Sequence, residues 1–409
     1  MRRIYFIIFF SSVWACNQAK SIDIDSAKSP IGLLMDISIS EAINGRDAGP
    51  EYMAAGDNCS LFTSNNGISW NILQGASTPF ANCSGGVIYG LAQGNGRWVA
   101  VGTLTNDYLT FANNCGLWSS ADGVNWVRHI CPSPNILSFS NTPLRSVVFG
   151  NVGGVGMFFA AGHKMGVSAN EDYYGLVSLD GMNWAFKKLG PTPTVDGGLM
   201  TTCYLEIDNG VARCSGETGS YSDAILKYNS SSGVWVADAD LPSYMGYAAF
   251  PDSPPNYNPS TSWFYGGPNH SRFTFGQGDS ANYINRKLPG GDWVEVATNV
   301  LMAPYTYGLL LNSAAYKGNL IVALGDACTW MNSTDAGANW TPYASIGSCT
   351  YDNGMPDFLS VTYNSYVKQF VGAGRSGRVV YSETGLEPSS WTVLETGFSG
   401  TINTLISKP

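Results

Sequence analysis

The sequence is poor in charged residues and in histidine, and it lacks long hydrophobic runs. Charged residues make up 12% of the 409 residues, about half of the usual share of ~25%. The net charge of −9 argues against a nucleic-acid partner, because a phosphate-binding face needs clustered Lys and Arg. It also argues against electrostatic docking on anionic lipid. Hydrophobic residues reach 44%, so the chain has enough apolar material for a sizeable core.

Residue patterns that would indicate a metal, a cofactor or a nucleophile are also missing. The three histidines, His129, His163 and His270, lie far apart and lack the spacing of zinc ligands, so we expect no metal site. No segment combines a strand, glycines and a helix in the way that a phosphate-binding loop requires. No GxSxG nucleophile elbow is present. We therefore expect no cofactor, and we assign no catalytic residue.

Residues 1–15 have the layout of a secretory signal peptide, a basic head followed by a short apolar run. The run is too short to span a bilayer, which needs ~20 residues. Its end resembles a relaxed bacterial lipobox, in which a small residue precedes a cysteine that becomes lipidated. Ala15 fits this pattern, whereas Val13 and Trp14 depart from it. The resemblance implies lipid attachment at Cys16; cleavage after Ala15 without lipidation is the alternative.

The lipoprotein resemblance places the chain in a bacterial cell envelope. Asn17 rather than Asp follows Cys16, which the resemblance links to outer-membrane sorting, with the periplasmic or surface side left open. No second apolar run reaches spanning length, so we expect membrane contact through the lipid alone. Residues 16–48 are expected to form a tether, with a possible extra strand at Gly32–Ile39.

One pattern recurs seven times: a small polar residue, an Asp or Asn, a Gly and then a Trp, with about 53 residues between successive tryptophans. The full copies are Ser64–Trp70, Ser120–Trp126, Ser178–Trp184 and Ser333–Trp340, and the degenerate copies end at Trp235, Trp293 and Trp391. Such a period over most of the chain indicates one repeated structural unit.

A β-rich run that closes on Gly or small residues precedes each copy, and another apolar strand precedes that run. These runs, each expected to be a second strand, are Tyr52–Gly56, Trp98–Gly102, Phe158–Gly162, Val211–Gly216, Trp263–Gly266, Ile321–Gly325 and Phe370–Gly374. Each unit therefore corresponds to four short antiparallel strands. Seven such units predict an all-β chain, a seven-bladed β-propeller over residues 49–409.

The Ser-x-Asp-(x)-Gly-x-x-Trp element resembles the Asp-box of BNR/sialidase-type propellers, and the resemblance covers residues 50–400. It implies a turn between the third and fourth strands, in which the Asp accepts turn N–H groups and the Trp packs between blades. These carboxylates are therefore expected to be structural rather than catalytic. The positions concerned are Asp122, Trp126, Asp180, Trp184, Asp335 and Trp340.

The ring has to close. The segment Ser399–Ile406 follows the last Trp as a first strand would, and we expect it to lie inside the first blade, where it removes open edges. Gly32–Ile39 is a rival for the same position. The C-terminal strand is the preferred closure.

Removing Cys16 leaves eight cysteines, which exported proteins commonly pair. Three of them lie at the start of a third strand and three lie just past a fourth strand, and these strand ends are neighbours. The register predicts Cys59–Cys83, Cys115–Cys131 and Cys328–Cys349, with Cys203–Cys214 joining the first two strands of the fourth blade.

Long loops are expected on one face of the propeller only, the face with the strand 2–3 loops and the blade-to-blade connections. This marks a candidate recognition surface, and Tyr-, Asn- and Ser-rich loops suit a protein or glycan ligand. The alternative is that the loops only decorate a stable scaffold. Candidate binding residues are Tyr108, His163, Tyr173, Tyr174, Tyr221, His270, Arg272 and Arg375.

The sequence therefore favours a monomeric, non-enzymatic envelope lipoprotein that binds a protein or a glycan. One alternative is a divergent sialidase-like glycoside hydrolase. It would need an arginine cluster for the sugar carboxylate, and the Phe/Tyr-Arg-Ile-Pro motif of that family is absent. The other alternative is an envelope assembly factor, which would present one broad apolar patch.

Overall fold

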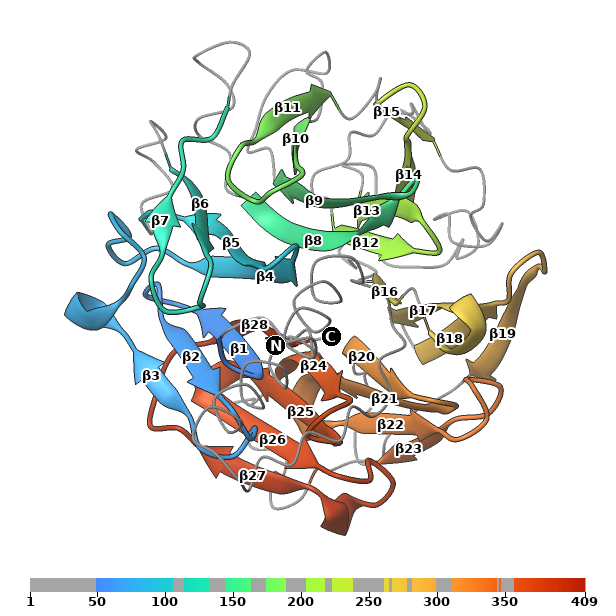
Figure 1. Ribbon diagram of the computed structural model, residues 1–409. Helices are drawn as coiled ribbons and strands as arrows, with labels where there is room; N and C mark the ends of the chain where they lie inside the picture. Colours follow the sequence, from blue (N-terminus) through green and yellow to red (C-terminus); the bar gives the residue numbers. More distant parts are fainter. Residues whose placement is uncertain are drawn as a thin grey trace, which may run out of the picture. The chain divides into compact units, whose positions relative to one another are not determined.

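The computed structural model shows seven four-stranded antiparallel sheets arranged as the blades of a ring (Figure 1). All described elements belong to one compact unit, Ala48–Pro409. The predicted all-β, seven-bladed propeller is confirmed. The structure describes residues 49–105, 114–132, 144–162, 174–188, 204–217, 223–237, 261–264, 267–277, 282–298, 311–343, 346 and 357–408.

Each blade runs from an inner strand to an outer strand. Blade 1 contains β28 (Ile402–Ser407), β1 (Tyr52–Gly56), β2 (Leu61–Ser64) and β3 (Asn71–Leu73), and blade 2 contains β4 (Ile88–Gly94), β5 (Arg97–Thr103), β6 (Cys115–Ser120) and β7 (Val127–Arg128). Blade 3 contains β8 (Leu144–Val152), β9 (Val155–Gly162), β10 (Tyr174–Ser178) and β11 (Ala185–Lys188), and blade 4 contains β12 (Tyr204–Asp208), β13 (Val211–Glu217), β14 (Asp223–Asn229) and β15 (Val234–Ala237).

The remaining three blades follow the same order. Blade 5 contains β16 (Thr261–Phe264), β17 (Arg272–Gln277), β18 (Asn282–Lys287) and β19 (Trp293–Thr298), and blade 6 contains β20 (Leu311–Lys317), β21 (Leu320–Gly325), β22 (Trp330–Ser333) and β23 (Thr341–Tyr343). Blade 7 contains β24 (Phe358–Asn364), β25 (Gln369–Gly374), β26 (Arg378–Ser382) and β27 (Thr392–Glu395). Short 3-10 turns are η2 (Gly75–Ser77), η4 (Pro268–His270), η5 (Asp326–Cys328), η6 (Arg375–Gly377) and η7 (Pro388–Ser390). Within the described ranges, no helix has the length and apolar character needed to cross a membrane.

Burial explains why the second strands are continuous apolar or small-residue runs. Every residue of β1 and β25 is buried, because neighbouring blades cover both faces of these strands. A short strand that is buried on both faces has no alternation of polar and apolar residues. The outer strands β3 and β27 are partly exposed and carry mixed residues.

The ring closes through the C-terminal strand, as predicted. β28 pairs with β1 in antiparallel register, with Tyr52 opposite Ser407. The Asp57 carboxylate accepts the Thr401 N–H at 2.9 Å, which fixes the start of β28. The rival segment Gly32–Ile39 lies outside the described residues, and β28 fills the inner position of blade 1.

The strand order gives the blades two different faces. We call the face with the strand 1–2 and strand 3–4 connections the turn face, and the face with the strand 2–3 and blade-to-blade connections the loop face. Turn-face connections are short, such as the two residues between β4 and β5. Loop-face connections include the long segments 104–114, 189–203, 238–260 and 299–310.

Blade 5 departs from the prediction. Trp263–Gly266 is not the second strand: β16 is the inner strand, and the second strand is β17. The run resembles a second strand because of the turn that follows it. This turn, η4, contains two residues with positive φ, Asn269 and His270, and η5, which follows the second strand of blade 6, also contains two such residues. Packing between blades agrees with β17 as the second strand. Trp340 of blade 6 contacts Phe273 and Phe275 of β17, each at 5.8 Å between ring centroids.

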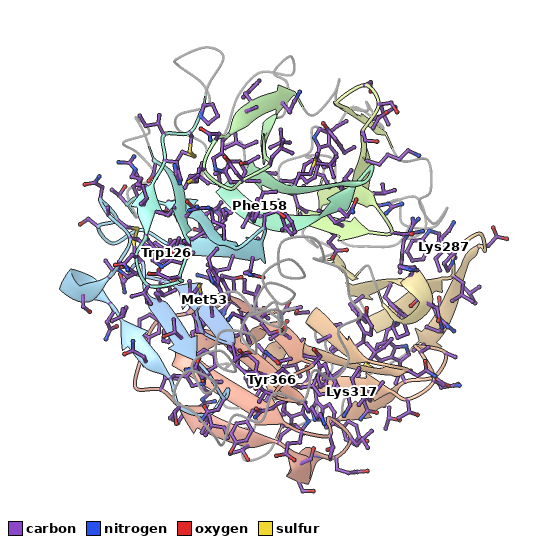
Figure 2. The ribbon with its side chains drawn as sticks, in the orientation of Figure 1. Met53, Trp126, Phe158, Lys287, Lys317 and Tyr366 are labelled. Carbon is purple, nitrogen blue, oxygen red and sulfur yellow. A yellow bond between two sulfur atoms is a disulfide. The ribbon has the colours of Figure 1, made fainter. Side chains whose placement is uncertain are left out.

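The repeat tryptophans fill the spaces between adjacent blades. Trp126 of blade 2 belongs to a buried cluster with Met53 of blade 1 (Figure 2). Trp235 contacts Phe159 of the preceding blade at 5.7 Å, and Trp391 packs edge-on against Trp330 of its preceding blade at 5.5 Å. Aromatic side chains therefore contribute large packing area at these three junctions.

The four full copies, which we call the repeat turns, share one hydrogen-bond pattern. In blade 2, Asp122 Oδ1 accepts the backbone N–H groups of Val124 and Asn125 at 2.8 Å each, and Trp126 Nε1 donates to Gly123 O at 3.2 Å. The same Trp-to-Gly bond has a length of 3.0–3.1 Å in the other three copies. In the degenerate copies ending at Trp235 and Trp391, the buried Nε1 atom has no partner among the described atoms.

These hydrogen bonds lower the pKa values of the repeat-turn carboxylates. The backbone N–H of Asn125 is the main cause that holds the pKa of Asp122 below its usual range, and Asp180 is shifted in the same direction by its own turn. Burial raises the pKa of Asp335, but hydrogen bonds from Asn339 and its neighbours outweigh this and lower the pKa to about 2. The carboxylates therefore serve as ionised hydrogen-bond acceptors within their turns.

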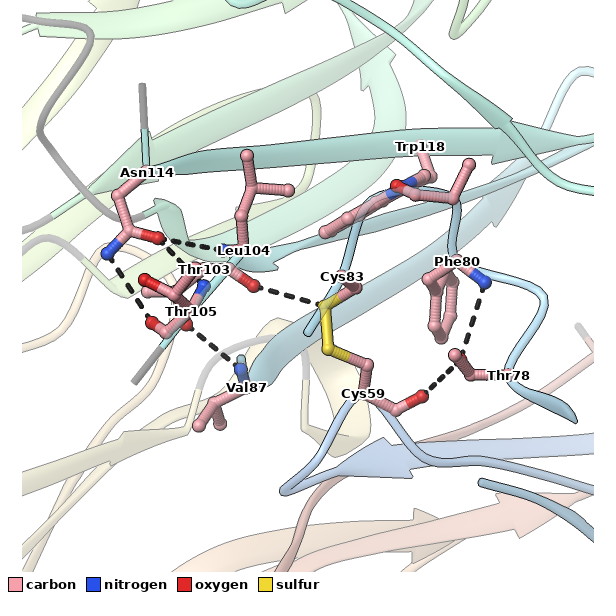
Figure 3. Close-up of a disulfide and its surroundings, with 11 residues drawn as sticks. Cys59, Thr78, Phe80, Cys83, Val87, Thr103, Leu104, Thr105, Asn114 and Trp118 are labelled. Atoms are coloured by element: carbon pink, nitrogen blue, oxygen red, sulfur yellow. Dashed lines mark hydrogen bonds between the residues drawn. A yellow bond between two sulfur atoms is a disulfide. The ribbon is translucent and has the colours of Figure 1, made fainter. Parts of the chain in front are cut away.

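Two predicted disulfides are confirmed, Cys59–Cys83 and Cys115–Cys131, with Cα–Cα distances of 6.1 and 6.4 Å. Figure 3 shows the first, which ties the strand 2–3 turn of blade 1 to the connection into blade 2. Cys214 and Cys328 are also disulfide-bonded. Their predicted partners, Cys203 and Cys349, lie outside the described residues, so these two pairings stay predictions.

Candidate functional site

Five of the seven inner strands carry a β-bulge at the same place, the second residue from their loop-face end. In blade 3, for example, Leu144 pairs with Gly162 and Ser146 pairs with Ala161, so Arg145 is the inserted residue. A bulge re-aims a side chain and is frequent next to functional sites. The five inserted residues are Asn403, Tyr89, Arg145, Asn312 and Leu359, in blades 1, 2, 3, 6 and 7.

A glycine at the end of the second strand permits the bulge. A Cβ on Gly56 would collide with the backbone carbonyl oxygen of Thr401, just before β28 begins. Gly102 and Gly374 approach the equivalent carbonyl oxygens in blades 2 and 7 in the same way. The glycines that close the second-strand runs are therefore sites of close backbone approach.

The residue after this glycine holds the bulged segment in place. Asp57 accepts the Thr401 N–H and the Asn403 Nδ2–H, the latter at 3.3 Å. In blade 6, Asn312 Nδ2 donates to Asp326 Oδ1 at 2.8 Å and to Phe358 O of blade 7 at 3.0 Å. Each bulged Asn is thus oriented by a carboxylate of its own blade.

Arg145 and Tyr89 form the most distinctive pair among the bulged residues. The guanidinium carbon of Arg145 lies 3.8 Å from the centroid of the Tyr89 ring, which belongs to the neighbouring blade. Both side chains are half-buried. Among the described residues, no carboxylate forms an ion pair with Arg145. A guanidinium stacked on a ring keeps its edge N–H donors available to a carboxylate or a hydroxyl group.

Arg375 contributes a second cation on the loop face, and it differs from Arg145 in being ion-paired. Its Nε lies 3.0 Å from Asp357 Oδ2; the Arg375 side chain is 56% exposed, whereas that of Asp357 is 8% exposed. Asp357 also accepts the Ala327 N–H of blade 6 at 3.2 Å. This ion pair therefore fastens the junction of blades 6 and 7.

Hydrogen bonds join the two ends of the connection between β5 and β6. Asn114 Oδ1 accepts the backbone N–H groups of Leu104 and Thr105 at 2.9 and 3.0 Å (Figure 3). Thr103 Oγ1 accepts the Val87 N–H at 2.9 Å, at the start of the inner strand of the same blade. The two chain segments that border residues 106–113 are thus held together by hydrogen bonds.

The structure places the predicted binding residues unevenly. Tyr108, His163, Tyr173 and Tyr221 lie outside the described residues. Tyr174 is the first residue of β10 and Arg375 begins η6, so both lie at the loop face.

Two predicted positions are on the other face. His270 ends η4 and Arg272 begins β17, and this connection joins strands one and two of blade 5. Their assignment to a strand 2–3 loop is therefore wrong. The cause is the misassigned strand at Trp263–Gly266.

Sequence reasoning missed the bulged residues, although a signal for them exists. In each case an apolar residue, the inserted residue and a small residue follow one another, as in Ile88–Gly90 and Leu144–Ser146. The apolar residue is buried opposite the second-strand glycine, and the small residue resumes the pairing. Blades 4 and 5 show no such bulge in their described inner strands.

The described part of the chain holds no group of three or more His, Cys, Asp or Glu residues that could bind a metal ion. What it presents at the loop face is a set of hydrogen-bonding side chains and a stacked arginine. Such an arrangement suits noncovalent recognition of a carboxylate, an amide or a hydroxyl-rich ligand.

No known protein-family model matches the chain, and no curated protein matches it in sequence. Solved structures do resemble it. A structure described as YCF48 from Cyanidioschyzon merolae is 11% identical, with 82% of this chain and 92% of that chain covered and a TM-score of 0.51. YCF48 bound to D1 peptide is 14% identical, with coverages of 78% and 85% and a TM-score of 0.48. U3-55K is 8% identical, with coverages of 78% and 84% and a TM-score of 0.48. At these identities the likeness shows the propeller fold alone.

Proposed function

We propose that the protein is a non-enzymatic, lipid-anchored propeller that binds a protein or glycan ligand at its loop face. The observation that carries this proposal is the set of bulges at the loop-face ends of five inner strands. Folding needs the paired residues of those strands, whereas the inserted residue makes no ladder pair. Four of the five inserted residues carry polar groups, namely Asn403, Tyr89, Arg145 and Asn312.

The Arg145–Tyr89 pair is the proposed anchor point for the ligand. Because the Tyr89 ring supports the guanidinium, less conformational entropy is lost when a ligand carboxylate binds. Asn312 and Asn403 donate through Nδ2 to the scaffold and offer their side-chain oxygens as acceptors around the inner ends of the blades. The long loop-face connections would then provide the selective contacts.

The anchor in this proposal is an acylated Cys16, with residues 1–15 as the cleaved lipoprotein signal and an outer-membrane location. Expression of the full chain with radiolabelled palmitate tests it directly. Label should appear on the wild-type chain and be absent from Cys16→Ser, which should also leave the outer-membrane fraction. A labelled Cys16→Ser chain, or an unlabelled wild type, would contradict the anchor.

Ligand binding is tested on an array of glycans, including sialylated and uronic-acid glycans, and of envelope and matrix proteins. Arg145→Ala should weaken the strongest signal by about tenfold, the size expected for losing one charge-assisted contact. Arg378→Ala is the matched control, because Arg378 pairs with Glu395 at 2.9 Å on the outer strands and should leave the signal unchanged. Uniform silence of the wild type, or equal losses in both variants, would contradict the proposal.

A sialidase-like activity is the competing function, since a stacked arginine would also suit a sugar carboxylate. The same chain incubated with a fluorogenic sialoside separates the two. Binding without release of the fluorophore is expected. Turnover that disappears in Arg145→Ala would overturn the non-enzymatic proposal.

A further inference from the structure

Among the described residues, the turn face carries a set of exposed apolar side chains. Of the thirteen large apolar residues that are exposed in the described chain, nine lie at strand 1–2 or strand 3–4 turns. These nine are Ile68, Val124, Val155, Leu179, Met182, Leu288, Tyr316, Tyr366 and Leu386. The other four lie on or just after the outermost strands. Turn tips usually carry polar residues, so these exposed apolar tips require an explanation.

Four of the nine occupy the same position, directly after the glycine of a turn between strands three and four. Ile68, Val124, Met182 and Leu386 are 45%, 58%, 42% and 39% exposed. They belong to blades 1, 2, 3 and 7, which are consecutive in the ring. In the three repeat turns among them, the turn uses only the backbone N–H of this residue, which the Asp or Asn accepts. Folding therefore does not require an apolar side chain there.

Both ends of the described chain lie on this face. Gly49 and Pro50 pack against the repeat turn of blade 2, where a Cβ on Gly123 would lie 2.9 Å from Pro50 Cδ. Lys408 Nζ donates to Gly49 O at 2.9 Å, beside the N-terminal entry point. Val124 lines the same shallow hollow as Gly49 and Pro50. Gly49, the first described residue, therefore lies next to the apolar tip Val124 of blade 2.

Building on the proposed anchor at Cys16, we infer that the turn face rests on the lipid surface, with Ile68, Val124 and Met182 inserted among the lipids. The segment 16–48, even fully extended, spans at most about 120 Å. An anchored chain therefore keeps this face at a high local concentration near the bilayer. This adds a second membrane contact to the lipid, and it turns the loop face away from the membrane toward its ligand.

The charges of the turn face indicate how the contact is made. Asp122 and Asp180 lie beside the apolar tips, while Lys317 and Lys368 are exposed on the strand 1–2 turns of blades 6 and 7. With both signs present, attraction to anionic lipid is not the driving force. Burial of apolar surface is, and it responds little to screening by salt.

Vesicle flotation of the full chain carrying Cys16→Ser tests the inference without the lipid anchor. Vesicles of phosphatidylethanolamine and phosphatidylcholine in equal parts should carry part of this chain upward, at low and at high salt alike. Adding Ile68→Ser, Val124→Ser and Met182→Ser should lower the partition coefficient by at least about tenfold, because three apolar side chains no longer leave water.

The matched control adds Val127→Ser, Val236→Ser and Val294→Ser to Cys16→Ser. These residues are 62%, 36% and 58% exposed, on the outermost strands β7, β15 and β19. This variant should float like its parent, and both triple variants should retain the parent's melting curve.

Three results would overturn the inference: no flotation of the Cys16→Ser chain, equal losses in the two triple variants, or a dimer in sedimentation that the turn-face triple variant dissociates. The last result would make the turn face an interface between copies. Because this experiment needs no acyl chain and no ligand, its failure is separable from failure of the palmitate labelling or of the array.

Discussion

At the residue scale, a glycine couples the second strand to the inner strand in blades 1, 2 and 7. Gly374→Ala places a methyl group against the carbonyl oxygen of Asp357, and neither backbone segment is free to move because Arg375 N donates to that same oxygen at 2.9 Å. We expect a loss of roughly 2–4 kcal/mol in the free energy of unfolding. Denaturant titration of the purified chain measures it.

The control for this prediction is Gly291→Ala. Gly291 lies in the exposed β18–β19 turn without a positive φ, and a Cβ there meets nothing closer than 3.5 Å. Its change should stay within about 0.5 kcal/mol. If both variants unfold at the wild-type midpoint, the Gly374 Cα does not lie as close to the Asp357 carbonyl oxygen as the structure indicates.

The repeat-turn aspartates predict a loss of stability in acid. The pKa of Asp335 is about 2 in the folded chain, below ~3.9 for an unfolded Asp. Its contribution is therefore present above pH ~4 and is lost as the pH falls from ~4 to ~2. Unfolding free energies measured between pH 7 and pH 2 should show this decline.

The turn of blade 1 is a natural comparison for the acid sensitivity of the blade 6 turn. Its Asn66 accepts the same type of backbone N–H groups but has no titrating carboxylate. Ser69 of blade 1 corresponds to Asn339 of blade 6. Asp335→Asn combined with Asn339→Ser gives the blade 6 turn the two corresponding side chains of the blade 1 turn, while Ala336, which has no counterpart in blade 1, stays in place. At pH 7 the double variant should be close to the wild type, and it should lose less stability than the wild type between pH 4 and pH 2. Parallel pH curves for the two chains would contradict the assignment.

At the scale of elements, the disulfides fasten loop-face connections to their blades. The Cys115–Cys131 bond closes a loop with a sequence separation of 16 residues, for which the chain-entropy model gives about 3 kcal/mol. The variant Cys115→Ser with Cys131→Ser should lose roughly that amount in denaturant titration. A loss well below 1 kcal/mol would mean that the connection is held by other contacts.

Peptide mapping without reduction tests the two pairings that stay predictions. Cys203 should be linked to Cys214 and Cys328 to Cys349, and no thiol of these four should react with an alkylating reagent before reduction. A Cys214–Cys328 link, or a free thiol among the four, would show that the register argument does not extend to blades 4 and 6.

Features that recur at the same position in each repeat could be predicted from the sequence. Features that break the repeat, such as an inserted residue, could not. The tryptophans and the second-strand glycines recur, so the blades, their number and two disulfides followed from them. The bulges at Tyr89 and Arg145 insert one residue into a strand whose apolar pattern is otherwise regular, and a period-two pattern does not distinguish an inserted residue from a paired one. In blade 5 the same local turn occurs after the first strand, and only packing between blades reveals it.

At the scale of the whole molecule, closure joins residues from opposite ends of the chain. β28 bonds to β1 within blade 1, and it also contacts blade 7, where Ser360 Oγ donates to Leu405 O at 3.1 Å and Thr362 Oγ1 lies 2.8 Å from Ser407 Oγ. Closure therefore makes the first and last blades neighbours through one strand. We expect the aromatic contacts at other junctions, such as that of Trp340 with Phe273, to depend on this closure.

A chain that ends at Gly400 tests this dependence. Without β28, blade 1 loses its inner strand and exposes the buried edge of β1, including Met53 and Ala55. We expect a lower melting temperature by at least about 10 °C, or aggregation through the open edge. Calorimetry measures it, with a chain that ends at Lys408 as the control that should melt like the full chain.

A synthetic peptide of residues 401–408 separates closure from a general effect of truncation. If β28 acts by pairing, the peptide should bind the Gly400-terminated chain and raise its melting temperature in proportion to the logarithm of peptide concentration. The same peptide with Leu405→Asp should fail, because Leu405 is buried between blades 1 and 7. A truncated chain that melts like the full one, or a rescue that ignores the Leu405→Asp change, would mean that the ring is stable without its closing strand.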